Sequence, residues 1–502
     1  MKSSRDGVFL GIDIGTTVLK VGVFDRATGA LITGASRNLK TKTTQDGGRE
    51  QSPEAVLRLL FSALRESREN AGRHWTRIAG IGVAAQGGSS IIADRVSGRA
   101  HTPMILWNDG RTREHNARIA EETSSAYWRK IALRDVPPAG LGRLLWLRET
   151  RGELYHGGNI HCGIGEYVLH QLTGVWRQDA GHAIQIGGYD AAKGTVAQGP
   201  LDLVELPLSF FAPLRNGHET SPLSSSVAKR LGLGAGIPVA GPYIDQEAGF
   251  LASLGKLKRP LQCSLGTAWV GNFVLPPRLR GGSPYQLVLP NPAGDGRLVV
   301  QPLLSGNAAW DWALASLIGG TPTRALDRAE KTLSEQPLPP RGLTAIPWHG
   351  QPNPMCLDAN GAGAVFGMSA TTSREALVRA VAAGMVCELR RVFDAVVRHK
   401  FCDGVVLCGG ASKGSYFQRL IATAFAPLPV FRLADEDYAA ARGTLYGLRK
   451  DAARGKVVAC KPLAKRWASP FDSCYDDYIR AFDRVYGNIP AGNAFSIGKE
   501  SK

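Results

Sequence analysis

A glycine-rich turn close to the start of the chain limits what this sequence can fold into more than any other feature. Residues 8–12 and 18–24 form two short apolar runs, each of strand length and rich in β-branched side chains. The DIGTT sequence between them, at residues 13–17, has the composition of a tight turn. The chain therefore predicts a β-hairpin, and Gly15 in its turn lets the backbone approach a ligand closely.

The same turn carries groups that suit an anion and its metal. The backbone amides of Gly15, Thr16 and Thr17 can face phosphate oxygens. Asp13 lies at the lip of the turn, where a carboxylate can hold hydrated Mg²⁺. A plain hairpin with a capping aspartate would use the same residues, so this segment alone leaves both interpretations open.

Two further glycine-rich segments favour the phosphate-binding interpretation. Residues 263–269 have the sequence CSLGTAW, and residues 405–412 have the sequence VVLCGGAS. Three such elements in one chain are much harder to obtain by chance than one.

The length of 502 residues is enough for two domains. A second pattern of strands begins at Leu261 and has its own glycine–threonine turn at residues 266–267, so the chain looks like two related halves. We expect one domain at residues 1–255, a second at 256–490 and a flexible tail at 491–502.

Composition narrows the class of protein and its partners. The chain has 44% hydrophobic and 21% charged residues, which is typical of a soluble globular protein, and no apolar run approaches the ~18–20 residues of a membrane span. With no apolar signal region at the N-terminus, we expect a cytoplasmic protein without a membrane partner. The net charge of +17 comes from dispersed residues, which favours a basic surface that attracts nucleotide over a nucleic-acid partner. The eight cysteines form no Cys-x-x-Cys pair, which indicates reduced thiols and no zinc site.

Helix signals are clear at three places. Ser52 followed by Pro53 is typical of a capped helix start. Thr372 with Glu375 three residues later predicts a capping box. Aromatic and aliphatic residues at helical spacing predict a last helix at about residues 470–486.

Polar residues follow several predicted strands of the first half. The strand at residues 78–85 ends in Gln86 and Gly87, and the strand at 104–107 ends in Asn108 and Asp109. The strand at 238–244 opens into a helix at Asp245. Because ligands of α/β sheets bind at such strand ends, we expect the substrate there. The candidate substrate-binding residues are Gln86, Gly87, Trp107, Asn108, Asp109, Asp245 and Gln246.

Six segments, in order along the chain, resemble those of the FGGY carbohydrate kinase family, and the resemblance covers about residues 7–490. They are GIDIGTT at 11–17, ILWNDGRT at 105–112, Asp245-Gln246, SLGT at 264–267, the region 347–367 with its NGAGAVFG sequence, and GGASK at 409–413. The resemblance implies an α/β protein with two actin-like (ribonuclease H-like) domains and a cleft between them for ATP and a sugar.

The resemblance also implies a role for individual residues. Asp245 is the expected general base, which takes the proton of a sugar hydroxyl. Asp13 and Asp245 are the expected metal ligands, the carboxylates nearest the Mg²⁺ that accompanies ATP. The implied ATP-binding residues are Gly15, Thr16, Thr17, Lys20, Gly266, Thr267, Gly306, Gly409, Gly410 and Ala411.

The segments point to more than one substrate. After the residue equivalent to Gln86, xylulokinases carry Met-His and glycerol kinases carry Arg-Glu, whereas this chain has GGS at residues 87–89. We expect these small residues to leave a roomier pocket with free backbone amides, which disfavours both D-xylulose and glycerol. Gln246 next to Asp245 resembles the residue that glycerol kinases have there, while the segment at residues 107–109 resembles that of xylulokinases. We expect ATP-dependent phosphorylation of a pentulose or related ketose, with an erythritol- or glycerol-type polyol as the alternative.

Two other classes of actin-like protein are weighed against a kinase. A chaperone or filament ATPase needs no sugar pocket, so the segment at residues 105–112 argues against it. A non-catalytic sugar sensor does not need Asp13, Asp245 and the turn at 266–267 to be intact, and it stays as a further alternative. The expected partner is a small carbohydrate, and a homodimer is left open.

Overall fold

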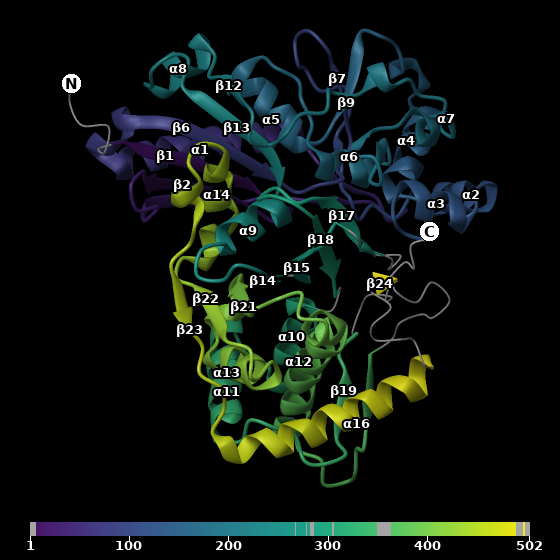
Figure 1. Cartoon of the computed structure of the whole chain (residues 1–502), viewed down its shortest axis with the longest axis vertical. Helices are drawn as coiled ribbons and strands as arrows, with labels where there is room; N and C mark the ends of the chain where they lie inside the picture. The colour runs from purple at the N-terminus through teal and green to yellow at the C-terminus, as the bar shows by residue number, and fades with distance from the viewer. Residues whose placement is uncertain are drawn as a thin grey trace.

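The chain forms two halves, each built around one large mixed sheet (Figure 1). The structure, a computed structural model, describes residues 7–266, 268–277, 279–281, 286–303, 306–348, 363–487 and 495–496. Within these residues no helix is long and apolar enough to cross a membrane. Seven cysteines are described, none of them in a disulfide and six of them buried, while Cys356 lies outside the described residues. That the thiols are reduced stays a prediction.

The N-terminal sheet has the strand order β12-β13-β6-β1-β2-β3. The predicted hairpin is confirmed, because β1 and β2 pair antiparallel around the DIGTT turn. β6 and β13 then add in parallel on the other side of β1. The bounds are β1 Val8–Ile14, β2 Val18–Asp25, β3 Leu31–Asn38, β6 Ile78–Ala85, β12 Thr220–Pro222 and β13 Pro238–Ile244.

The C-terminal sheet has the order β17-β18-β15-β14-β21-β22-β23 and repeats the topology of the first. β14, β15 and β18 form an antiparallel meander like that of β1, β2 and β3, and β21 and β22 add in parallel as β6 and β13 do. The two related halves expected from the sequence are therefore present. The bounds are β14 Pro260–Leu265, β15 Trp269–Leu275, β17 Leu287–Pro290, β18 Arg297–Pro302, β21 Gly404–Cys408, β22 Val430–Leu433 and β23 Val457–Ala459.

Helices pack around both sheets, and small sheets complete the loops (Figure 1). The helices are α1 Pro53–Ala71, α2 Arg113–Glu122, α3 Ser125–Ile131, α4 Ala139–Thr150, α5 Ile164–Thr173, α6 Ala180–Ile186, α7 Gln198–Asp202, α8 Ser225–Leu231, α9 Asp245–Ser253, α10 Asn307–Ala313, α11 Pro322–Glu335, α12 Arg374–Arg398, α13 Ser415–Ala424, α14 Ala439–Gly443, α15 Lys450–Ala453 and α16 Ala468–Tyr486. The remaining strands are β4 Lys42–Thr43, β5 Arg49–Gln51, β7 Ile91–Asp94, β8 Met104–Ile105, β9 Asn159–Cys162, β10 Tyr189–Asp190, β11 Thr195–Val196, β16 Arg280–Gly281, β19 Thr344–Ile346, β20 Ala364–Phe366 and β24 Phe495–Ser496.

The helix starts follow the local sequence signals with one exception. Ser52 caps α1 by accepting a hydrogen bond from the amide of Ala55 at 3.1 Å, as predicted. The capping box predicted at Thr372 is wrong, because the hydroxyl of the next residue, Ser373, accepts from the amide of Ala376 and begins α12. Thr372 and Ser373 both carry a hydroxyl group that can cap a helix, and the helix begins after the second of them.

A segment near the C-terminal end of the sequence packs against the N-terminal sheet. Helix α14 packs against β1, β2 and α9, as Figure 1 also shows for the sheet. Gly443 allows the close approach, because a side chain there would overlap the carbonyl oxygen of Ala248 in α9. The domain boundary at residue 255, which lies between α9 and β14, stays a prediction, and residues 439–443 connect the two halves across it.

Candidate active site

Two carboxylates emerge at the same edge of the N-terminal sheet. β1 and β13 flank β6, where Asp13 lies beside Ala84 and Ile244 lies beside Ala85. Asp245 follows Ile244 directly, so it stands across β6 from Asp13. Burial raises the pKa of Asp245 to about 7, and the charge of Asp13 adds to the shift. Burial also raises the pKa of Asp13 to about 6, against the opposing effect of Lys20.

This pair fits a divalent cation. The Oδ1 atom of Asp13 is buried and has no hydrogen-bond partner among the described residues. Two partly desolvated carboxylates that repel one another form a set of hard oxygen donors, which Mg²⁺ prefers. A cation between Asp13 and Asp245 would remove both the repulsion and the unmet hydrogen-bonding capacity.

A second carboxylate pair, which the sequence analysis missed, holds the backbone in front of Asp245. Asp179 accepts the amide of Ile244 at 3.0 Å and the amide of His182 at 2.8 Å. The side chain of Glu247 lies in the same buried environment, and burial together with the charge of Asp179 raises the pKa of Glu247 well above its usual value. An aspartate at position 179 is recognisable in the sequence as a possible N-cap of α6. Nothing in the local sequence indicates that the same side chain also contacts β13.

The first glycine-rich turn is connected to Gln86 and Trp107, as expected for neighbours in one site. The hydroxyl of Thr16 donates to Oε1 of Gln86 at 2.9 Å and accepts from the indole nitrogen of Trp107 at 3.1 Å. The amide of Gly15 donates to the carbonyl of Val18 within the turn, while Thr17 is exposed. Trp107 is 40% exposed, which leaves part of its ring open to a ligand.

Lys20 and Gln246 lie where the two halves meet. Lys20 is paired with Asp13 across the hairpin, and its ammonium group donates to the carbonyl of Asp437 at 2.6 Å. The side-chain oxygen of Gln246 accepts from Nδ2 of Asn272 in β15 at 3.1 Å. Both predicted residues therefore reach the C-terminal half from the N-terminal one.

The predicted nucleotide residues of the C-terminal half also come together. β14 and β21 pair in parallel with Ser264 beside Cys408, so Gly266 and Gly409 follow neighbouring strand ends. The carbonyl of Gly266 accepts the amide of Asn307, the residue after Gly306. Gly409 has a φ of 86° and lies against Leu265, and Gly410 and Ala411 continue into the short helix Gly410–Lys413. Thr267 lies outside the described residues.

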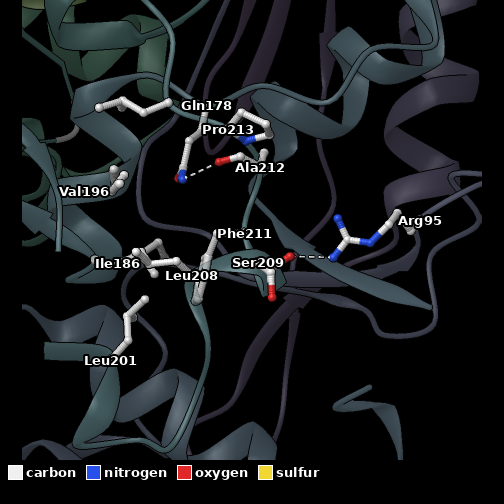
Figure 2. A pocket seen from close by; sticks show the side chains of 13 residues that line it. Arg95, Gln178, Ile186, Val196, Leu201, Leu208, Ser209, Phe211, Ala212 and Pro213 are labelled. Atoms are coloured by element: carbon white, nitrogen blue, oxygen red, sulfur yellow. Dashed lines mark hydrogen bonds between the residues drawn. The ribbon is translucent and has the colours of Figure 1, made fainter. Parts of the chain in front are cut away.

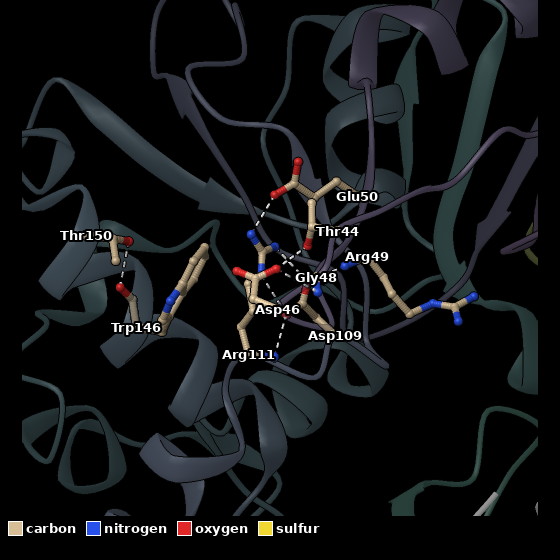
Figure 3. Close-up of polar contacts among 9 residues, drawn as sticks. All are labelled: Thr44, Asp46, Gly48, Arg49, Glu50, Asp109, Arg111, Trp146 and Thr150. Carbon is tan, nitrogen blue, oxygen red and sulfur yellow. Dashed lines mark hydrogen bonds and ion pairs between the residues drawn. The ribbon is translucent and has the colours of Figure 1, made fainter.

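Asp109 and Asn108 have different surroundings. Asp109 has no exposed side-chain surface, and its carboxylate pairs with Arg111 at 2.7 Å and accepts the amide of Arg49 (Figure 3). Arg111 also pairs with Glu50 at 2.7 Å. Asp109 therefore holds the loop together rather than facing a ligand. Oδ1 of Asn108 is buried and has no hydrogen-bond partner in the part of the chain that the structure describes, so Asn108 keeps a free acceptor.

The expectation of a roomier pocket at Gly87 and Gly88 is wrong, and so is that of a free amide at Gly88. A Cβ at Gly87 would overlap Nε2 of Gln185, and a Cβ at Gly88 would lie 2.7 Å from its Oε1. The amide of Gly88 donates to Nδ1 of His182 at 3.4 Å. Helix α6 thus fills the space with a side chain from a distant part of the sequence.

A separate cavity of about 440 Å³ borders α6 (Figure 2). Its lining includes Ala183 and Ile186 of this helix, and none of the predicted site residues. Arg95 and Gln178 also line it, but their side chains donate to the backbone carbonyls of Ser209 and Ala212. The candidate active site is therefore distinct from this cavity.

Comparison with known proteins decides the family. The model of the N-terminal domain of the FGGY family of carbohydrate kinases matches residues 8–252, and the model of the C-terminal domain matches residues 288–446. The chain belongs to the FGGY family of carbohydrate kinases. Its two sheets, which share a core of five strands in the same arrangement, thus belong to the two actin-like (ribonuclease H-like) domains of this family, as expected from the sequence.

Curated relatives in this family carry the name glycerol kinase. The chain is 27% identical over 276 residues to "Glycerol kinase" of Thermococcus onnurineus, covering 54% of each chain. It is 22% identical over 465 residues to "Glycerol kinase 5" of Xenopus laevis, covering 83% of this chain and 91% of that one. The chain spans about half the length of the first of these relatives.

Solved FGGY kinases with several substrate names share the fold. A xylulose kinase from Rhodospirillum rubrum superposes with a TM-score of 0.82 at 21% identity, covering 95% of this chain and 99% of that one. A gluconate kinase from Lactobacillus acidophilus gives a TM-score of 0.79 at 19% identity, covering 96% and 99%. Plasmodium falciparum glycerol kinase with ADP gives 0.79 at 15% identity, covering 95% and 98%. At these identities the likeness extends to the fold alone.

Proposed function

We propose that this FGGY kinase transfers the γ-phosphoryl group of ATP to a hydroxyl of a small neutral carbohydrate, with Asp245 as general base. The observation that carries the proposal is the position of Asp245 at the end of β13, across β6 from Asp13, with its pKa raised to about 7. A base whose pKa lies near the working pH combines a useful fraction of carboxylate with a strong drive to take a proton.

The reaction follows from this geometry. The hydroxyl oxygen of the sugar attacks the γ-phosphorus while the carboxylate of Asp245 accepts the hydroxyl proton. The bond between the γ-phosphorus and the oxygen that bridges to the β-phosphate breaks, and ADP leaves. Asp13 and Asp245 would hold Mg²⁺, which neutralises phosphate charge when bound. The turn amides of Thr16 and Thr17 would orient the phosphates from one half, and those of Gly266 and Thr267 would do so from the other. Gly15 lets the backbone come close to the phosphates, while its own amide is bonded to Val18.

Nucleotide binding is assigned to groups from both halves. Gly410 and Ala411 offer backbone on which the adenosine could lie, and Gly409, which packs against Leu265, makes the turn that leads into them. This stretch is close to Gly306 through Asn307. Lys20 bridges Asp13 and the segment around Asp437, so its charge lies beside the phosphate path. Because these groups belong to different sheets, we propose that ATP lies between the halves.

A pentulose or related ketose is the substrate class we favour, with an erythritol- or glycerol-type polyol as the second candidate. The exposed part of Trp107 offers an apolar wall for carbon-bound hydrogens of a sugar. The free acceptor of Asn108 and the amide nitrogen of Gln246, whose oxygen is taken by Asn272, complement hydroxyl groups. None of these three side chains carries a charge, which favours a neutral substrate.

The deciding experiment measures ADP release with MgATP and a panel of ketoses, polyols and sugar acids. A strong response to one pentulose supports the favoured substrate, and a response to a polyol supports the alternative. Bound ATP with no response to any carbohydrate would support a sensor instead. ATP hydrolysis that ignores every carbohydrate would contradict the kinase proposal.

The pH dependence of kcat/KM should report the ionisation of Asp245. Only its carboxylate form can take a proton, so kcat/KM is expected to rise about tenfold per pH unit below pH ~7 and to level off above it. Removing the nearby charge in Asp13→Asn should move the midpoint to lower pH, because Asp13 contributes to the raised pKa. A pH-independent rate between pH 5 and 8 would contradict this role.

Asp179 should act on Asp245 through the backbone of Ile244. In Asp179→Asn one carboxylate oxygen becomes an amide group that cannot accept an N–H, so kcat is expected to fall about tenfold with little change in the carbohydrate KM. Glu247→Gln is the matched control, because it changes a neighbouring buried carboxyl in the same way but leaves the bond between Asp179 and the amide of Ile244 in place. Equal losses in the two variants would contradict a positioning role for Asp179.

A further inference from the structure

The segment after Gln86 forms part of the wall of the candidate active site. Gln86 itself bonds to Thr16 in the first glycine-rich turn. The side chain of Arg143 donates to the carbonyls of both Gly88 and Trp107, which joins these two stretches of backbone. Gly87 and Gly88 therefore directly follow a residue that contacts the phosphate turn, and Arg143 ties their backbone to that of Trp107.

Gln185 is that group. Its side-chain amide packs against Gly87 and Gly88 so closely that a Cβ on Gly87 would overlap Nε2 and lie 2.9 Å from Cδ. The same Cβ would lie 3.0 Å from Cγ2 of Ile244, the residue that precedes Asp245. Gln185 and the last residue of the strand that carries the base thus border the same space at Gly87.

The amide of Gln185 is without a partner in the described chain. The side chain is only partly buried, and it forms no hydrogen bond with any described residue. An amide offers two donors and one acceptor oxygen, and leaving them unmet in a closed site costs free energy. A ligand hydroxyl or carbonyl can meet them.

We infer that Gln185 is a specificity-determining residue that binds a hydroxyl or carbonyl group of the neutral substrate from helix α6. The inference rests on the proposed function and deepens it. A neutral amide donates and accepts, so it matches a hydroxyl group, whereas it offers no charge to a carboxylate. The side chain also limits the length of substrate on this side, because it fills the space beside Gly87.

The positively charged side chain of Arg143, which lies beside this wall, does not change the assignment to Gln185. Arg143 is buried, and two of its nitrogens are used by the carbonyls of Gly88 and Trp107. His182, on the same side of Gly88, is neutral because burial lowers its pKa to about 3. The accessible polar group at the glycine pair is therefore the amide of Gln185.

The test uses the full-length protein and the best neutral substrate from the panel. Gln185→Met keeps the length of the side chain and removes its hydrogen bonds, so the carbohydrate KM is expected to rise about tenfold with kcat changed less than threefold. Gln185→Ala should show the same rise and also accept longer substrates. Gln171→Met is the control, because the Gln171 amide in α5 bonds to the carbonyl of Gly98, and it should keep the KM.

A double-mutant cycle with Gly87→Ala separates a contact from a general disturbance. The backbone of Gly87 does not have a positive φ, so alanine is compatible with its conformation, but its Cβ must displace Gln185. Gly87→Ala alone should therefore raise the KM about as much as Gln185→Ala does. The double variant should resemble either single variant, because each removes the same contact.

Two results overturn the inference. If both Gln185 variants keep the KM and the substrate ranking of the native chain, Gln185 does not bind substrate even though the kinase proposal stands. If the native chain releases no ADP with any carbohydrate, binding is measured directly by calorimetry. Equal binding of one panel carbohydrate by the native chain and Gln185→Met, or no binding to the native chain, then rejects the role of Gln185 as well.

Discussion

Replacing Asp245 by asparagine is expected to lower kcat at least about a hundredfold while carbohydrate binding is largely kept. Asparagine has the shape and polarity of aspartate, and its side-chain oxygen can still accept the amide of Gln246 as Asp245 does at 2.8 Å. It cannot take a proton, so the sugar hydroxyl loses its base in the transition state. Steady-state ADP release and carbohydrate titration by calorimetry measure the two quantities.

Stability separates this loss from misfolding. A buried carboxyl whose pKa is raised from 3.8 to about 7 holds its proton better in the folded state than in the unfolded state. Its contribution to the free energy of unfolding therefore falls as pH rises from about 4 to 7 and stays lost above that. Asp245→Asn should melt at the same temperature as the native chain or higher at pH 8. The exposed Asp476 provides a control, since Asp476→Asn should change neither kcat nor the melting temperature. Unchanged turnover in Asp245→Asn would remove Asp245 from the mechanism.

Local sequence determined the parts of the site that lie within one turn of a strand end. The resemblance grouped Asp13 with Asp245, and the structure gives the physical reason, because the ends of β1 and β13 lie at one edge of the sheet on either side of β6. Gln86 and Trp107 were candidates because they lie at the ends of predicted strands. The relation between Gly266 and Gly409 also followed from two strand ends that turned out to be neighbours.

Residues that act from a distant helix could not be predicted in this way. Gln185 occupies the space beside Gly87, and Asp179 holds the amide of Ile244, but both reside on or next to α6, whose docking is a property of the tertiary structure. Asp109 shows the opposite case. Its position after a strand suggested a ligand, yet Arg111 two residues later engages its carboxylate. A polar residue at a strand end is thus a candidate for ligand binding, but the side chains packed around it determine whether its polar atoms remain available to a ligand.

Replacing Asp13 by asparagine is expected to lower kcat about a hundredfold at a fixed concentration of Mg²⁺ and to abolish most of the stabilisation that Mg²⁺ gives. In the native chain, Mg²⁺ with ADP should raise the melting temperature, because a ligand that binds only the folded state stabilises it. The variant keeps the buried oxygen position but loses the charge that attracts the cation. The melting temperature is measured with ADP in the presence and absence of Mg²⁺, so the readout does not depend on turnover.

The unliganded form of the same variant should behave in the opposite way. The pKa of Asp13 is raised from 3.8 to about 6, so ionisation of this carboxyl destabilises the folded state progressively between about pH 4 and pH 6, and the loss persists at higher pH. Without ligand, Asp13→Asn should therefore melt a few degrees above the native chain at pH 8 and at about the same temperature at pH 4. A variant that is more stable alone but gains nothing from Mg²⁺ would show that Asp13 is kept for the cation at the expense of stability. An equal gain from Mg²⁺ in both chains would place the metal on other residues.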